Sequence, residues 1–147
     1  MPGSFEDLEV YQEARKFRKR IYKLAKLLPP EEKTGLAPQM RHAAVSLTNN
    51  IAEGEGRWNR QDAIRFHRIA RGSLFELLDD INVCSDEHYA EERHLADLRE
   101  HGYRVRRLLD GYIRYLNDRK CKDDAERRAV KRQTHRVTDE PSNQVTA

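Results

Sequence analysis

The sequence predicts an all-α protein, an antiparallel up-down-up-down four-helix bundle in residues 1–117 with a charged C-terminal tail in residues 118–147. Two observations predict this fold. Apolar residues recur at spacings of three and four in four successive segments, as in amphipathic helices. Short polar, proline- or glycine-containing segments separate them, which favours antiparallel neighbours. Charged residues make up 36% of the chain, so each helix is expected to carry a charged outer face.

The first predicted helix spans about residues 5–28. Ser4 is a suitable N-cap, and Pro29 and Pro30 end the helix because proline disfavours a helical residue before it. Its core face consists of the apolar residues Val10, Ala14, Phe17, Ile21, Leu24 and Leu28.

The second predicted helix spans about residues 36–54. Pro38 lies in its first turn, where a missing N–H does no harm, and Gly54 and Gly56 end it. Its core face consists of Leu36, Met40, Ala43, Leu47 and Ile51.

The third predicted helix spans about residues 60–85. Asn59 is a good N-cap, and Asp62 three residues later resembles the second member of a capping box. Gly72 interrupts the helix at a cost of about 1 kcal/mol relative to alanine, so we expect another helix to approach closely there. The core face consists of Ala63, Phe66, Ala70, Leu74, Leu77, Ile81 and Cys84.

The fourth predicted helix spans about residues 91–116, with Gly102 and Gly111 as weak points. After Asn117 the chain has mixed charge and few apolar residues, which predicts a frayed helix and then a disordered tail in residues 118–147. The core face consists of Leu95, Leu98, Val105, Leu109, Tyr112 and Leu116.

Small and polar residues replace leucine and isoleucine at several helical positions of the second and third helices. Buried polar groups need partners, so these residues predict a specified helix–helix contact. They also allow a ligand or protein contact. The structural or interface candidates are Asn50, Glu53, Gly54, Arg57, Gly72, Ser73 and Glu76.

Basic residues cluster on the first and fourth helices, although the net charge is only +3 and the pI about 8.9. A basic stripe is what contact with phosphates requires, and it is also an ordinary solvated face of a bundle. The C-terminal tail adds Arg127, Arg128, Lys131 and Arg132. The candidate nucleic-acid-binding residues are Arg15, Lys16, Lys19, Arg20, Lys23, Lys26, Arg104 and Arg107.

Other site chemistries find little support. Glu91 and His94 match the Glu-x-x-His motif of di-iron bundles once, without the second motif that such a site needs, so we expect no metal, cofactor or catalytic residue. Cys84 and Cys121 lack metal or redox spacing, and the chain shows no signal peptide or membrane span. A cytoplasmic protein is therefore expected. The basic first helix could lie on an anionic membrane, but a bundle core explains its apolar stripe better.

Between Phe5 and Leu116 the chain resembles the small bacterial four-helix-bundle proteins described as 23S rRNA intervening-sequence proteins. Their relatives include the accessory variability determinant of diversity-generating retroelements. The resemblance rests on Phe5–Leu8, Leu28–Pro29, Gly35–Leu36, Gln39, Arg41, Ala43–Ala44, Asn50–Gly54, Gly56–Arg57, Arg65–Phe66, Ala70, Gly72–Leu74 and Glu76. His67 and Arg71 depart from the family's apolar residues, on a face that the pattern associates with oligomer contacts.

The resemblance implies a bacterial, non-enzymatic homo-oligomer, commonly a pentamer, whose retroelement relatives bind a reverse transcriptase and nucleic acid through basic surfaces. Two functions therefore remain open. The protein is either an accessory module that presents basic helices to RNA, DNA or a reverse-transcriptase-type partner, or a protein-interaction scaffold without nucleic-acid binding.

Overall fold

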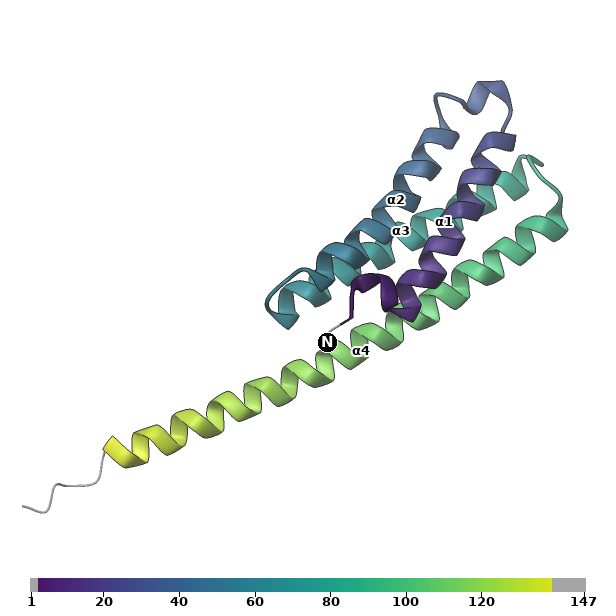
Figure 1. The fold of residues 1–147 in the computed structure, drawn as a ribbon. Helices are drawn as coiled ribbons and strands as arrows, with labels where there is room; N and C mark the ends of the chain where they lie inside the picture. The colour runs from purple at the N-terminus through teal and green to yellow at the C-terminus, as the bar shows by residue number, and fades with distance from the viewer. Residues whose placement is uncertain (1–2, 139–147) are drawn as a thin grey trace, which may run out of the picture.

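The computed structural model of the protein describes residues 3–138, and within them the regular structure is entirely helical. Successive long helices run in opposite directions, and α4 extends well beyond the other three (Figure 1). The all-α four-helix architecture predicted from the sequence is confirmed. The elements are the 3-10 turn η1 (Phe5–Asp7), α1 (Glu9–Leu27), the 3-10 turn η2 (Pro30–Glu32), α2 (Leu36–Glu55), α3 (Arg60–Asp86) and α4 (Glu92–Thr138).

Local sequence signals set most of the helix ends. The backbone N–H of Asp62 donates to the Asn59 side chain at 2.8 Å, which is the predicted N-cap of α3. Ser4 caps the short turn η1 rather than α1 itself, since its hydroxyl accepts from the Glu6 N–H at 3.4 Å. The chain then leaves helical geometry at Leu8 before α1 begins.

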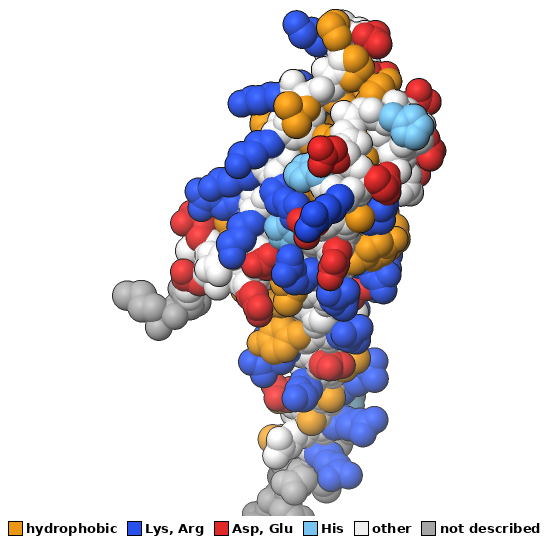
Figure 2. Space-filling model, turned by 90° about the vertical axis from the view of Figure 1, so that its right-hand side faces the viewer, with side chains coloured by type: hydrophobic (Ala, Val, Ile, Leu, Met, Phe, Trp, Pro, Cys, Tyr) orange, Lys and Arg blue, Asp and Glu red, His pale blue; other side chains and the backbone are white. Residues whose placement is uncertain are grey.

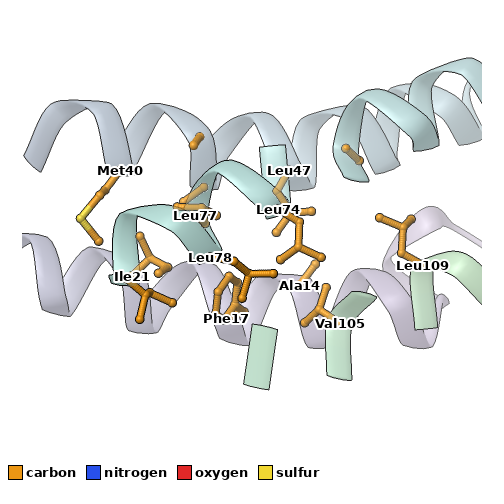
Figure 3. Close-up of a cluster of buried hydrophobic side chains, with 14 of the residues drawn as sticks. Ala14, Phe17, Ile21, Met40, Leu47, Leu74, Leu77, Leu78, Val105 and Leu109 are labelled. Carbon is orange, nitrogen blue, oxygen red and sulfur yellow. The ribbon is translucent and has the colours of Figure 1, made fainter. Parts of the chain in front are cut away.

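The core lies along the bundle axis and draws on all four helices (Figure 3). Every residue of the three predicted apolar faces on α1, α2 and α3 is buried. On α4 the prediction fails at one place: Tyr112 is only partly buried and Ile113 takes the core position. Tyr112 instead turns its hydroxyl toward a carboxylate of α2, as described below.

Close helix approach occurs at a glycine of α4 and not at the predicted one of α3. A Cβ atom on Gly102 would lie 2.7 Å from Leu78 Cδ2 and 3.1 Å from Phe17 Cζ, so α1 and α3 side chains occupy the space that it leaves. Gly72 is exposed, and its Cβ would meet no atom within 4 Å. The expectation of a close contact at Gly72 within this chain is therefore wrong.

The fourth helix does not end at Leu116. It continues to Thr138, although none of its residues after Leu116 is buried. The predicted change from packed helix to charged, solvated chain thus takes place within one continuous helix (Figure 1). The disorder expected for the last residues concerns positions 139–147, which lie outside the described residues.

Candidate nucleic-acid interface

The outer face of α1 carries a row of exposed cations. Residues 14, 17, 21 and 24 face the core, and the helical period of 3.6 places the intervening basic residues on the opposite side. Lys and Arg side chains follow one edge of the molecule and continue along the projecting part of α4 (Figure 2). Five of the six α1 candidates are exposed: Arg15, Lys16, Lys19, Lys23 and Lys26.

Arg20, the sixth candidate, is only partly exposed and is held by α4. Its guanidinium donates to Asp97 at 2.6 Å and to Nδ1 of His101 at 3.1 Å. Arg20 is therefore part of the α1–α4 joint, and its guanidinium is less available to a phosphate than the five exposed cations. Arg18 is likewise occupied, since it donates to the Thr48 hydroxyl of α2 at 2.7 Å.

His101 completes this joint from the α4 side. It is buried, and its Nε2 lies 3.1 Å from a Glu13 carboxylate oxygen. Burial lowers the pKa of His101, so the ring is neutral at pH 7. Because Arg20 donates to Nδ1, the proton sits on Nε2, which donates to Glu13. Periodicity alone did not single out these contacts, since they depend on which helix lies beside which.

The two α4 candidates, Arg104 and Arg107, are exposed near α1. Arg104 follows His101 by three residues and is close enough to contribute to the lowered pKa of that ring. Arg107 lines a shallow surface hollow together with Leu8, Glu9 and Val10 at the start of α1. The exposed cations of α1 and those of α4 therefore belong to adjoining surfaces, which we call the α1–α4 basic surface.

The predicted polar contact between α2 and α3 forms around Ser46, Asn50 and Ser73. Asn50 Nδ2 donates to the Ser46 carbonyl at 2.8 Å and to its hydroxyl at 3.1 Å. The two serine hydroxyls lie 2.8 Å apart, and Ser73 also donates to the Ile69 carbonyl at 3.3 Å. The chain of bonds fixes the register of the two helices, and Ser46 is a member that the candidate list omitted.

The other residues of the predicted network lie outside it. Arg57 donates to Glu53, four residues earlier at the end of α2, at 2.7 Å. Its guanidinium also lies 4.3 Å from the Phe66 ring centre. Glu76 is exposed and has no side-chain hydrogen bond within residues 3–138. Glu76 does lie one helical turn from Ser73, as the spacing predicts, but its side chain points to the surface and not toward α2.

A second buried polar group joins α2, α3 and α4 around His67, which is fully buried. Its Nε2 lies 3.2 Å from Glu55, and the Tyr112 hydroxyl donates to the same carboxylate oxygen at 2.5 Å. Burial raises the pKa of Glu55, but these two bonds outweigh it and hold that pKa below its usual value.

Gly54 makes room for this group. A Cβ at Gly54 would lie 3.1 Å from His67 Nε2 and 3.2 Å from the Ala63 carbonyl, so its small size is structural. The expectation that His67 belongs to an exposed oligomer face is wrong, whereas Arg71 is partly exposed and paired with Asp110 at 2.7 Å.

Asp80 is a buried carboxyl group with an unsatisfied oxygen. Its Oδ2 has no hydrogen-bond partner among the described residues. Burial raises the pKa of Asp80 to about 6, and the neighbouring Glu76 and Asp79 carboxylates add to the effect. No cation within residues 3–138 forms an ion pair with this carboxyl group, so its burial is expected to affect stability.

Two further features bear on function. In residues 3–138 no three His, Cys, Asp or Glu side chains converge as a metal site would require. None of the helices in that range has the length and apolar character needed to cross a bilayer.

A family model matches most of the chain. Residues 6–111 match the model of the 23S rRNA-intervening sequence protein family. The chain belongs to this family. The resemblance stated above on individual motifs is thereby confirmed, and it covers the bundle and excludes the projecting part of α4.

A solved structure supports the same fold. The chain is similar to a protein of unknown function from the S23 ribosomal protein family of Bacteroides thetaiotaomicron, with 24% identity and a TM-score of 0.66. The match covers 71% of this chain and 95% of the other. No curated protein is significantly similar to the chain. Membership of the family points to an RNA-related role, and the family is not known for an enzymatic activity.

Proposed function

We propose that the protein is a non-enzymatic, nucleic-acid-associated accessory protein that acts in the cytoplasm and presents the α1–α4 basic surface to RNA or DNA. The observation that carries this proposal is the row of five exposed cations on α1, with Arg104 and Arg107 on the adjoining helix. Their side chains can each approach a phosphate, and such contacts release counterions from the nucleic acid. The family's connection with RNA makes RNA the first ligand to test.

The test is a fluorescence-anisotropy titration of labelled structured RNA and duplex DNA at low and physiological salt. The variant Arg15→Glu/Lys19→Glu reverses two charges one turn apart on α1. We expect its affinity for nucleic acid to fall about tenfold or more and the slope of log K against log salt to decrease by about two. Adding Lys26→Glu should deepen the loss.

The matched control is Arg65→Glu/Arg68→Glu, which reverses two exposed charges one turn apart on α3. This variant has the same net charge as the α1 variant. Because Arg65 and Arg68 lie beside Ile69 on α3, sedimentation checks that the control variant has the same association state as the unaltered protein. If it does and both variants lose affinity equally, binding follows net charge and the α1–α4 basic surface has no special role. If the unaltered protein binds neither RNA nor DNA at low salt, the proposal is wrong.

We further propose that the protein self-associates, with a pentamer as the first model, because repetition of the basic surface would strengthen binding by avidity. The outer face of α3 supports this proposal. Ile69 and Val83 are 43% and 36% exposed there, with the exposed Gly72 between them. Sedimentation of the unaltered protein and of Ile69→Asp/Val83→Asp tests it, and a monomer at micromolar concentration would contradict it.

The same exposed apolar side chains favour a second candidate function, a protein-interaction scaffold whose partner could be a reverse transcriptase. This function predicts partner capture that survives Arg15→Glu/Lys19→Glu and is abolished by Ile69→Asp/Val83→Asp. Nucleic-acid binding by each subunit is instead lost in Arg15→Glu/Lys19→Glu, whereas Ile69→Asp/Val83→Asp removes only the contribution of avidity.

A further inference from the structure

The turn between α2 and α3 exposes the Trp58 side chain completely. Its backbone neighbours are nevertheless fixed. The Gly56 N–H donates to the Ala52 and Glu53 carbonyls, the Arg57 side chain is held by Glu53 and Phe66, and Asn59 caps α3. An indole presented on an anchored turn, without packing from its own chain, is a flat apolar surface available to a ligand.

Trp58 is one of the residues that line a cleft of about 630 Å³ between this turn and α4. The α2–α3 turn lies beside the stretch of α4 where this helix leaves the bundle (Figure 1). Arg60 of α3 donates to Asp123 of α4 at 2.6 Å, which ties the two walls together. The volume is within the range of small-ligand sites, which is about 300–1,000 Å³.

The opposite wall supplies a second aromatic surface and two cations. Tyr115 is about half exposed and stacks on Tyr112, with ring centres 5.9 Å apart and planes 24° from parallel. Lys120 and Arg127 line the same cleft from α4, and neither forms an ion pair within residues 3–138. Aromatic faces beside unpaired cations are what sites for unstacked nucleotides combine.

Carboxylates in the cleft indicate which part of a nucleic acid would enter. Asp62 and Asp124 also line it, so a run of phosphates would meet negative charge there. A nucleobase would meet acceptors for its N–H groups, while its own phosphate reached Lys120 or Arg127. Bases in a duplex are stacked and paired and cannot reach such a wall.

We infer that this cleft binds an unpaired nucleobase of a nucleic acid, with Trp58 as the stacking surface and Lys120 and Arg127 as contacts to the flanking phosphates. The inference rests on the proposed function, because it names the form of nucleic acid that the protein takes. It gives a role to Trp58 and to the helical extension of α4, which the α1–α4 basic surface does not use.

Trp58 is the single tryptophan of the chain, so its intrinsic fluorescence reports on this cleft alone. The experiment titrates the full-length protein with single-stranded RNA of about 12 nucleotides and with a perfectly paired RNA duplex of the same sequence. Single-stranded RNA should quench the tryptophan, and the duplex should not. Anisotropy of labelled RNA is followed in parallel.

The variant Trp58→Ala should weaken single-stranded RNA binding by about 5-fold to 150-fold, the range for loss of one stacked base. Trp58→Phe keeps an aromatic face and should lose less. Tyr103→Ala, which removes a partly exposed aromatic side chain of α4 outside the cleft, is the matched control and should bind normally. Circular dichroism checks that each variant is folded.

The possible failures are distinguishable. RNA binding that loses affinity in Arg15→Glu/Lys19→Glu but is unchanged in Trp58→Ala, without quenching, overturns this inference and leaves the proposed function standing. Equal quenching by the duplex overturns the assignment to unpaired bases. Absence of binding to any RNA or DNA removes the proposed function and the inference together.

Discussion

The helix α4 contains two stretches that differ in apolar content and have very different surroundings. In residues 92–116 a core-facing residue is buried at almost every turn, among them Leu95, Leu98 and Leu109. In residues 117–138 no residue is buried, and Val130 is 63% exposed. One uninterrupted helix is thus a packed component of the bundle in its first part and a solvated rod in its second.

The difference separates two sources of helix stability. Burial of apolar surface stabilises the first part, at about 25 cal/mol per Å² removed from water. The second part depends on backbone hydrogen bonds, on continuity with the first and on the Arg60–Asp123 pair, because an isolated helix of this length is marginal in water. What the extension contributes is surface, including one wall of the cleft beside Trp58.

The largest expected effect comes from removing the same kind of side chain in each part. Leu98→Ala leaves a cavity in the core and should lower the free energy of unfolding by about 2–5 kcal/mol. Val130→Ala should change it by less than about 0.5 kcal/mol, since the side chain is exposed. Urea denaturation followed by circular dichroism measures both. Similar losses in the two variants would mean that the extension is packed in solution.

The next effect comes from Asp80, which is buried in the bundle and forms no ion pair with any cation of the described part of the chain. Its pKa is raised in the folded state, to about 6 from an ordinary value near 4, so the native protein binds the proton more strongly than the unfolded chain. The stabilisation that comes from protonation of Asp80 is therefore lost as the pH rises from about 4 to about 6. Above about pH 6 the ionised carboxylate destabilises the fold.

Asp80→Asn should raise the free energy of unfolding at pH 7 by about 2 kcal/mol, and the difference from the unaltered protein should disappear near pH 4. Denaturation across this pH range measures it. Asp79→Asn, at an exposed neighbouring position, is the control. A difference that stays constant with pH would contradict the assignment to titration of Asp80.

Two glycines of α4 measure how tightly its first part is packed. Gly102→Ala should destabilise the protein by about 1–3 kcal/mol, because the new Cβ would displace Leu78 and Phe17. Gly111→Ala should stabilise it by about 0.5–1 kcal/mol, because only Arg114 Nη2 lies within 4 Å of that Cβ. Thermal melts of both variants provide the test. If Gly102→Ala instead stabilised the protein, the Leu78 and Phe17 side chains would have to move aside without cost.

The smallest expected effect concerns the Arg60–Asp123 ion pair, which connects the bundle to the projecting part of α4. Arg60→Ala removes the bond to Asp123 between partly exposed side chains, so the midpoint of global unfolding should not change measurably. Amide hydrogen exchange around residues 117–127 should become faster, because local opening there no longer breaks the ion pair. Arg128→Ala, an exposed position outside this contact, should leave exchange unchanged.

Much of the fold could be predicted from the sequence because helix formation depends on local residue patterns. Every residue that the spacing of three and four assigned to the core faces of α1, α2 and α3 is buried, and Asn59 marked the start of α3. These signals act within one or two turns of the chain, so no knowledge of neighbouring helices is needed. The exposed cations of α1 followed from the same periodicity.

The candidate site could be predicted only where a residue's role depends on its own helix. Arg15 and Lys19 lie on the outer face as expected, but Arg20 is drawn into the α1–α4 joint by Asp97 and His101, which lie far away in sequence. Glu76 misses the α2–α3 contact although its spacing suggested membership. Hydrogen-bond partners across helices depend on rotation and register, which periodicity does not specify.

By itself the sequence determined the helical class, the core faces, the cap of α3 and the basic outer face of α1, since each arises from residues within a few turns of one another. Only the tertiary structure decided that His67, Asp80 and His101 are buried, that Gly102 rather than Gly72 takes the close contact, and that α4 passes beside Trp58 to form a cleft. These features depend on the distance between segments far apart in the chain, and packing of the four helices sets that distance.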